Sequence, residues 1–403
     1  TMTKTKVLLL ENIHTVARDL FAQKGFDVET AKSAMTVDAL KEKLRGVHVL
    51  GVRSKTNVPR EVFAAAPSLF AVGCFCVGTA NVALEAAKEH GVVVFNAPFS
   101  NTRSVAELMI SHIVAMARQI GPRNLEMHRG VWNKKSDGCH EVRGKTLGIV
   151  GYGNIGTQVS HLAEGMGLRV IYYDVVSKLS LGNAKQYAEL EALLRESDFI
   201  TLHVPATPLT TKMIGADELK AMKKGACLLN ASRGTVVDID ALAEALRNGH
   251  LAGAAVDVYP EEPEGNTDAF RSPLMGLNNV ILTPHIGGAT EEAQSSIGRE
   301  VATTLIRHVT EGATEGAVNF PIVHTAPLVG NAHRLINVHR NVPGVLKDIN
   351  RIVSSSGANI QSQTLATDPN VGHLVMDFDR ALPADCIQEI ETLAASIRTR
   401  VIG

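Results

Sequence analysis

Short apolar runs alternate with amphipathic stretches along the first hundred residues. The runs predict buried strands at Val7–Leu10, Val47–Val52, Leu69–Gly73 and Val92–Asn96. Between them, segments such as Asn81–His90 place apolar residues at helical spacing. Strands that alternate with helices in this way are typical of a domain built on a parallel sheet.

The same alternation resumes after a predicted long helix. That helix runs from about Ser104 to Ile120, where Gly121-Pro122 would end it. Strands with helical segments between most of them then predict a doubly wound sheet. These strands are Leu147–Val150, Arg169–Tyr173, Phe199–His203, Cys227–Asn230, Gly253–Val258 and Val280–Leu282. A helix from about Glu291 to His308 would return the chain to the first domain.

The last part of the chain follows a different pattern. Residues 312–330 combine Gly, Ala, Thr and Pro with few charges, which indicates a linker. The residues after it predict a split β-α-β-β-α-β unit. Its elements are Leu335–Val338, Gly344–Ser355, Asn359–Thr364, His373–Phe378, Asp385–Ile397 and Thr399–Ile402.

The fold class is therefore α/β. We expect two Rossmann-like doubly wound parallel-sheet domains with a cleft between them, followed by the C-terminal βαββαβ domain. The predicted domains are residues 1–102 with 289–322, residues 103–288, and residues 330–403.

Composition narrows the class of protein. The 403 residues are 45% hydrophobic and 20% charged, and the net charge of −1 gives no long-range attraction for nucleic acid or an anionic membrane. The five cysteines are odd in number and lack C-x-x-C spacing, which favours reduced thiols over disulfides or a metal site. No apolar run suits a signal peptide or a membrane helix. We expect a cytoplasmic protein that binds neither nucleic acid nor membrane and holds no metal.

A glycine motif predicts a dinucleotide site. Gly151, Gly153 and Gly156 form G-x-G-x-x-G at the end of a predicted strand and the start of a helix. The first glycine permits a tight turn, the second lets backbone approach a pyrophosphate, and the third lets helix and strand pack closely. Asp174 ends the next predicted strand, where a carboxylate binds ribose hydroxyls and repels a 2′-phosphate. The expected cofactor is NAD.

Three later strand ends carry residues suited to hydride-transfer chemistry. Oxidation of a secondary alcohol needs a base for the hydroxyl proton and a cation for the carboxylate and the forming carbonyl. His285 is the candidate base, Glu262 would orient its ring, and Arg233 offers a bidentate fork. Each residue alone could be an ordinary loop residue, and their order after strands of one sheet favours the catalytic interpretation.

Several segments resemble the D-2-hydroxyacid dehydrogenase family. They are G-Y-G-N-I-G from Gly151, N-A-S-R-G-T-V-V-D from Asn230, D-V-Y-P-E-E-P from Asp257 and T-P-H-I-G-G from Thr283. The segments Gly73–Thr79, Phe95–Glu107 and His128–Lys134 resemble the branch whose members oxidise 3-phosphoglycerate in the first step of serine synthesis. The resemblance covers nearly the whole chain.

The resemblance implies a role for each matching residue. Arg233, Glu262 and His285 become the catalytic triad, and the substrate contacts become Arg53, Ser54, Asn81 and Lys134, the last reaching a neighbouring subunit. The cofactor would be lined by Gly151, Gly153, Asn154, Ile155, Gly156, Asp174, His203, Ala231, Asp257 and Gly287. Many relatives carry a polar residue where Ala80 stands, which makes the neighbouring Asn81 contact less certain.

The C-terminal unit resembles an ACT domain, a regulatory module that binds amino acids. His339, Asn341 and Asn359 could hydrogen-bond an amino-acid ligand. In this branch the effector is L-serine, bound between paired domains, and the resemblance implies a homo-oligomer, a tetramer, that also reduces 2-oxoglutarate. A plain dimerisation module is the alternative for this unit. For the whole chain, the alternatives are a glyoxylate or hydroxypyruvate reductase and a non-catalytic NAD-sensing protein.

Overall fold

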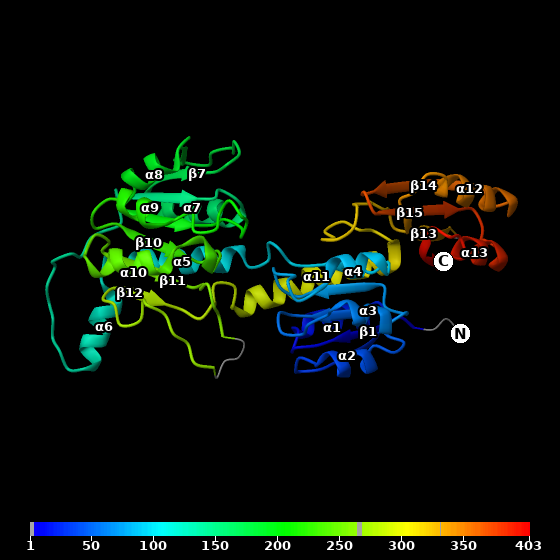
Figure 1. The fold of residues 1–403 in the computed structure, drawn as a ribbon, viewed down its shortest axis with the longest axis horizontal. Coiled ribbons are helices and arrows are strands. Elements are labelled where there is room, and N and C mark those ends of the chain that lie inside the picture. The colour runs from blue at the N-terminus through cyan, green and yellow to red at the C-terminus, as the bar shows by residue number, and fades with distance from the viewer. Residues whose placement is uncertain (1–3, 264–267, 331) are drawn as a thin grey trace. The chain divides into compact units, whose positions relative to one another are not determined.

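The computed structural model describes residues 4–263, 268–330 and 332–403. Residues 1–3, 264–267 and 331, which the predicted domains include, lie outside the described part. The chain divides into two compact units, Thr1–Ser100 with Gln294–Gly403, and Asn101–Ala293. The predicted α/β class is confirmed, because two parallel sheets and one antiparallel sheet carry the fold (Figure 1). None of the described helices combines the length and apolar character of a membrane span.

The first unit contains a five-stranded parallel sheet in the order β2-β1-β3-β4-β5. Its strands are β1 Lys6–Leu9, β2 Asp27–Thr30, β3 Val49–Val52, β4 Ala71–Cys74 and β5 Val93–Phe95. The helices α1 Thr15–Gln23, α2 Val37–Lys43, α3 Arg60–Ala65 and α4 Leu84–Glu89 connect them. The four predicted strands are confirmed with small shifts. The strand order reverses between β1 and β3, which is where ligands bind in open α/β sheets.

The second unit contains a seven-stranded parallel sheet in the order β12-β11-β10-β9-β6-β7-β8. Its strands are β6 Thr146–Val150, β7 Arg169–Tyr173, β8 Lys185–Gln186, β9 Phe199–Leu202, β10 Cys227–Asn230, β11 Gly253–Val256 and β12 Val280–Leu282. The helices are α5 Thr102–Ala117, α6 Ile120–His128, α7 Asn154–Gly165, α8 Leu190–Glu196, α9 Ala216–Ala221 and α10 Ile239–Arg247, with a 3-10 turn at Gly234–Val236. Here the order reverses between β6 and β9.

One helix boundary was predicted wrongly. We expected Gly121-Pro122 to end the long helix, but α5 ends at Ala117 and Gln119 adopts a left-handed conformation with φ 52°. Gly121 and Pro122 then lie in the first turn of α6. Proline is tolerated there because an N–H in the first turn has no partner within the helix.

The C-terminal part of the first unit is the predicted split βαβ sheet. Helix α11 Glu291–Glu311 leads toward it, and its strands pair antiparallel in the order β14-β15-β13-β16. The elements are β13 His333–Arg340, α12 Val345–Ser355, β14 Ile360–Thr367, β15 Val371–Phe378, α13 Ala384–Glu391 and β16 Ser396–Ile402. The last helix is shorter and the last strand longer than predicted, because residues from Ser396 onward pair with β13.

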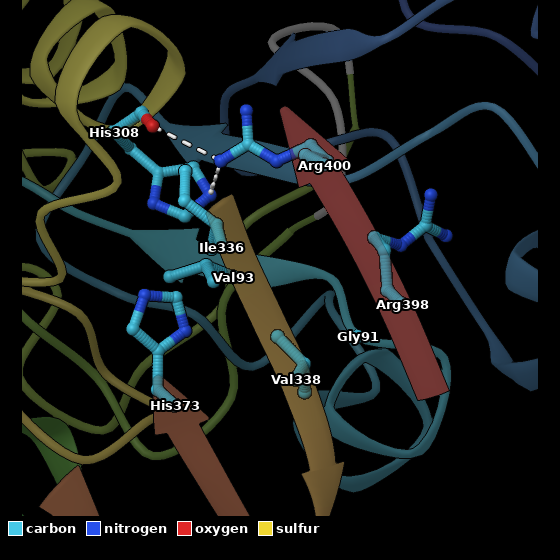
Figure 2. Close-up of a pocket in the computed structure, with 8 residues that line it drawn as sticks. All are labelled: Gly91, Val93, His308, Ile336, Val338, His373, Arg398 and Arg400. Atoms are coloured by element: carbon cyan, nitrogen blue, oxygen red, sulfur yellow. Dashed lines mark hydrogen bonds between the residues drawn. The ribbon is translucent and has the colours of Figure 1, made fainter. Parts of the chain in front are cut away.

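The two faces of this sheet pack against different neighbours. On β13, Leu335 belongs to a core with α12 and α13, whereas Val338 joins Val93 and Phe95 in the core of the parallel-sheet region. On the second face, Arg400 donates to the Nε2 atom and the carbonyl of His308 on α11 (Figure 2). The antiparallel sheet therefore shares a core with the rest of the first unit.

The segment predicted as a linker is partly built into that core. Asn319 accepts from Val94 N–H and donates to Val92 O, at 2.8 and 3.0 Å, and Phe320 is buried. The hydrogen bonds of Asn319 to the β5 region therefore fix the first half of residues 312–330.

Candidate active site

The glycine motif forms a tight turn between β6 and α7. Gly151 has φ +93°, and a Cβ added there would lie 2.2 Å from the carbonyl oxygen of His203. A Cβ on Gly156 would lie 2.2 Å from the carbonyl oxygen of Gly151. By contrast, a Cβ on Gly153 would meet nothing within 4 Å. The first and third glycines are therefore required by packing, and the second leaves open space at the helix N-terminus.

Asp174 lies beside this turn at the end of β7. Its Oδ2 atom accepts from Tyr152 N–H at 2.9 Å, and its Oδ1 atom accepts from Val176 N–H at 3.1 Å. Asn154 and Ile155 begin α7 on the other side of the turn. The structure thus brings the predicted ribose-binding carboxylate to the glycine motif, within the second unit.

His203 follows β9 on the other side of the strand-order reversal. Its Nε2 atom is 2.9 Å from Thr201 Oγ1, and its buried Nδ1 atom has no hydrogen-bond partner among the described residues. Burial lowers the pKa of His203 to about 3, so the ring is neutral near pH 7. Ala231, directly after β10, is half-buried.

Arg233 lies on a turn after β10, and the side chain of Asn230 stabilises this turn. The buried Asn230 side chain donates to Arg233 O at 3.0 Å and accepts from Ser232 N–H at 3.0 Å. A Cβ on Gly234 would lie 2.0 Å from the carbonyl carbon of Tyr259. This turn therefore packs directly on the backbone that leads to Glu262, and the Arg233 side chain is exposed.

Asp257 organises the loop that carries His285. Its buried carboxylate accepts from Thr283 Oγ1 at 2.6 Å, Ile286 N–H at 2.9 Å and Gly287 N–H at 2.8 Å. The Asp257 carbonyl also accepts from His285 N–H at 2.8 Å. Asp257 was predicted to line the cofactor, and its contacts in the structure are with this loop.

His285 and Glu262 form a hydrogen-bonded pair. The His285 Nδ1 atom lies 2.7 Å from Glu262 Oε2, and Glu262 Oε1 accepts from Tyr259 N–H at 3.0 Å. Because a carboxylate only accepts, Nδ1 carries the hydrogen, and in the neutral ring Nε2 keeps its lone pair. The His285 side chain is 54% exposed, so this second nitrogen is open to a reactant.

Tyr259 supports this pair from the core. Its hydroxyl donates toward Val256 O at 2.8 Å and Thr283 O at 3.0 Å. Burial raises the pKa of Tyr259 to about 12, so the hydroxyl remains a donor at neutral pH. Sequence reasoning did not single out Tyr259. Its position in D-V-Y-P-E-E-P, between two predicted site residues, was the available signal.

The predicted substrate residues Arg53 and Asn81 come together in the first unit. The Asn81 side chain donates to Arg53 O at 2.8 Å and Thr56 O at 2.7 Å. The loop is also held by Glu11, whose buried carboxylate accepts from the N–H groups of Arg53, Lys55 and Thr56 at 2.7, 2.9 and 3.2 Å. Ser54 is exposed at its tip.

Glu11 is a functional candidate that the sequence did not reveal. It follows β1 with φ 57°, directly at the strand-order reversal beside β3. Asn81 donates to backbone in the structure, so its contacts place it as a support of the Arg53 loop.

Lys134 lies in the second unit, on the exposed segment after α6. Arg123 donates to the carbonyls of Asn133 and Lys135, at 2.8 and 3.0 Å, on either side of it. Trp132 is 78% exposed beside it. The neighbouring apolar side chains Ile120, Leu125, Met127 and Val131 are exposed too.

The predicted effector residues lie on the four-stranded sheet of the first unit. His339 is buried, and burial lowers its pKa; its Nδ1 atom is 3.0 Å from Asn337 Oδ1. Asn341, at the end of β13, is exposed and donates to Asp368 O at 2.7 Å. Asn359, before β14, is exposed and pairs with Asp379 through its backbone.

Comparison with known proteins places this geometry in a family. The profile for the NAD binding domain of D-isomer specific 2-hydroxyacid dehydrogenase matches residues 110–287. The profile for an AHAS small subunit-like ACT domain matches residues 335–397. A D-3-phosphoglycerate dehydrogenase of Dictyostelium discoideum is 50% identical over 99% of this chain and 97% of its own. That of Escherichia coli K12 is 48% identical over 99% and 98%.

A solved structure supports the same placement. The D-lactate dehydrogenase of Aquifex aeolicus, complexed with NAD and lactic acid, has a TM-score of 0.67 and 27% identity. The match covers 78% of this chain and 99% of that one. The chain therefore belongs to the D-isomer specific 2-hydroxyacid dehydrogenase family, within its D-3-phosphoglycerate dehydrogenase branch.

Proposed function

We propose that this enzyme oxidises 3-phosphoglycerate to 3-phosphohydroxypyruvate with NAD, the first step of serine biosynthesis. The observation that carries the proposal is the His285–Glu262 pair on a loop fixed by the buried Asp257 carboxylate. The names of the relatives, at about half identity over nearly the full chain, support this choice of substrate. The five free cysteines fit a reducing cytoplasm.

The residues of the second unit fit NAD. The turn from Gly151 to Gly156 leaves open space at Gly153 and the start of α7, which suits a pyrophosphate. The Asp174 carboxylate beside it suits ribose hydroxyls and disfavours a 2′-phosphate. The bound dinucleotide supplies the hydride acceptor.

The protein's own residues handle the proton and the charge. His285 is fixed with its Nδ1–H toward Glu262, which leaves Nε2 to take the proton from the substrate hydroxyl. The imidazolium formed in this step is stabilised by the Glu262 carboxylate. Arg233 holds the substrate carboxylate through its guanidinium. In the reverse direction His285 returns the proton, and the same site reduces 2-oxoglutarate.

Substrate recognition is assigned to residues outside this triad. Arg53 and Ser54, on the loop supported by Glu11 and Asn81, suit the phosphate of a doubly anionic substrate. Lys134 is assigned to the site of a neighbouring subunit in a homotetramer. The exposed apolar side chains on and after α6, Ile120, Leu125, Met127, Val131 and Trp132, support self-association of this region.

L-serine is the proposed feedback inhibitor, bound by His339, Asn341 and Asn359. Asn337 donates to Ser396 and Thr399 and accepts from His339 Nδ1, so His339 Nε2 remains an acceptor. His339 and Asn341 lie at one end of the sheet, and Asn359 lies at the other end beside Asp379, so one serine would meet all three only between two paired domains. Serine binding to one arrangement of paired domains would then lower activity.

A direct assay of NADH consumption tests the proposal. Purified enzyme with 3-phosphohydroxypyruvate should consume NADH, and millimolar L-serine should slow the reaction. Activity with glyoxylate alone would instead support a glyoxylate reductase. Binding of NADH without turnover of any 2-oxoacid would support a sensor. The Asn341→Ala variant should keep turnover and need more serine for inhibition, and unchanged inhibition would remove Asn341 from the effector site.

A further inference from the structure

The proposed effector residue Asn341 is tied to the turn between β14 and β15. Its side chain donates to Asp368 O at 2.7 Å, and its backbone N–H donates to Asn370 O at 2.9 Å. The Asp368 Oδ1 atom accepts from the N–H groups of Asn370 and Val371, both at 2.8 Å. The turn is therefore a small rigid unit, and a ligand that hydrogen-bonds to Asn341 acts on this turn directly.

This turn is joined to helix α4 by an ion pair. The second carboxylate oxygen of Asp368 lies 2.9 Å from Lys88 Nζ, and the two side chains are 12% (Lys88) and 23% (Asp368) exposed. Burial alone would raise the pKa of Asp368, but hydrogen bonds from Val371 and Lys88 outweigh it, and the pKa is lowered. The carboxylate is thus charged at neutral pH and pairs with a partly buried cation.

The other end of α4 leads to the substrate loop. Ala83, directly before the helix, donates its N–H to Val58 O, and Val58 N–H donates to Asn81 O at 2.8 Å. Asn81 in turn donates its side-chain amide to the carbonyls of Arg53 and Thr56. A shift of α4 is therefore transmitted to the loop that carries Arg53.

Helix α4 has a second contact with the same sheet. Arg398 on β16 donates to His90 O, just after the helix, at 3.1 and 3.3 Å. This contact uses a carbonyl and involves neither Asn341 nor the 368–370 turn. Of the contacts described, the Lys88–Asp368 pair is the one that links α4 to the effector residue.

We infer that the Lys88–Asp368 ion pair couples serine binding at Asn341 to the position of the Arg53 substrate loop, an inference that rests on the function proposed above. Lys88 and Asp368 are positioning residues. They touch neither substrate nor cofactor, and they act through α4 and Asn81. The pair links the 368–370 turn, which contacts Asn341, to the substrate loop. An effector that moves the turn therefore also moves the loop.

The test is a double-mutant cycle in the full-length enzyme. Lys88→Met keeps the aliphatic stem and removes the charge, and Asp368→Asn keeps the Oδ1 acceptor of the turn and removes the partner charge. Each variant should raise the serine concentration for half-inhibition at least fivefold. The double variant should show no further rise, because the Lys88–Asp368 pair is lost in all three proteins.

Hydrogen–deuterium exchange gives a readout that does not depend on serine. The peptide covering residues 52–58 should exchange faster in both single variants than in the wild type. The matched control is Glu89→Gln on α4, which removes an ion pair with Arg60 of α3 without touching the 368–370 turn. This control should retain wild-type inhibition and exchange.

The outcomes separate this inference from the function on which it rests. The coupling would be overturned if both variants needed a serine concentration for half-inhibition within twofold of the wild-type value. It would also be overturned if the effects of the two substitutions added in the double variant. A wild-type enzyme that serine does not inhibit would refute the feedback proposal instead. In that case the exchange of residues 52–58 alone decides: acceleration in both variants supports the mechanical link, and unchanged exchange overturns it.

Discussion

The backbone of His285 is held in a conformation that few residues adopt. Its φ of 53° lies in the left-handed region, where a non-glycine residue costs about 1–3 kcal/mol. The bonds from Asp257 to the loop maintain this conformation. In this conformation the ring of His285 meets Glu262 through Nδ1, and Nε2 lies outside this hydrogen bond.

Two substitutions at His285 separate chemistry from backbone strain. Both His285→Asn and His285→Ala should lower turnover by roughly 10²–10⁴-fold, because the proton acceptor is gone. Asparagine tolerates the left-handed region and alanine does not, so His285→Asn should melt at the higher temperature. NADH fluorescence titrations should give affinities near that of the wild type for both. Loss of NADH binding together with turnover would contradict the assigned role.

Glu11 governs the Arg53 loop through three backbone hydrogen bonds. In Glu11→Gln one of the two acceptor oxygens becomes an NH₂ group facing N–H donors. The KM for 3-phosphohydroxypyruvate should therefore rise about tenfold, while kcat changes less. Glu29→Gln, which removes a surface ion pair with Lys43 near the same sheet, is the control and should leave both constants unchanged. An unchanged KM in Glu11→Gln would show that the loop does not bind substrate.

Residue-scale prediction reaches furthest where a site follows from local position. Arg233, Glu262 and His285 each follow a strand of one parallel sheet, and the structure pairs His285 with Glu262. Glu11 could not be found in that way, because its partners lie 42, 44 and 45 residues further along the chain. The left-handed backbone of His285 also depends on a contact with Asp257 that no local pattern encodes.

At the scale of elements, the β6–α7 turn assigns different tasks to its glycines. A Cβ on Gly156 would collide with the Gly151 carbonyl oxygen, whereas a Cβ on Gly153 would enter open space. A substitution at Gly156 therefore tests folding, and a substitution at Gly153 tests cofactor binding.

Gly156→Ala should lower the melting temperature of the enzyme without ligand, because backbone must move to admit the methyl group. Gly153→Ala should keep the wild-type melting temperature and weaken NADH binding about tenfold or more, because the methyl group occupies the space for the pyrophosphate. Melting curves and NADH titrations check both. Equal NADH affinity in Gly153→Ala and the wild type would move the pyrophosphate away from this turn.

Elements were predicted well where they are apolar and poorly where tertiary pairing defines them. The buried strands were found within a few residues. Strand β2 was missed because Asp27–Thr30 is polar and lies at the edge of its sheet. The last helix was predicted as far as Ile397 because its spacing is ambiguous there, and pairing with β13 converts residues from Ser396 into a strand.

At the scale of the molecule, the first unit buries basic groups beside its shared core. His308 and His373 are buried near Arg400, and Arg398 contributes further positive charge. His308 Nδ1 donates to Ala313 O and His373 Nε2 donates to Gly312 O, and burial lowers both pKa values so that both rings are neutral near pH 7. The residues around the small cavity in Figure 2 include no carboxylate to balance a further proton.

Stability should therefore fall in mild acid. Burial lowers the pKa of His373 from 6.5 to about 4, and that of His308 well below 6.5. Between pH 6.5 and 4 the unfolded chain binds more protons than the folded one, so the stabilisation present above pH 6.5 is lost as pH falls. The melting temperature should drop over this range, and less steeply in His373→Gln. The exposed His161→Gln is the control, and an identical slope in His373→Gln would contradict the role.

The shared core of the first unit bears on how the proposed inhibition by serine could be removed by engineering. Excising residues 330–403 would strip Val338 and Val371 from the cluster that contains Val93 and Phe95, and would leave that apolar surface to water. Such a truncated enzyme should be recovered mainly as aggregate. A strain built to overproduce serine is therefore better served by a single exchange at the proposed effector residue Asn341 than by deletion of the four-stranded sheet.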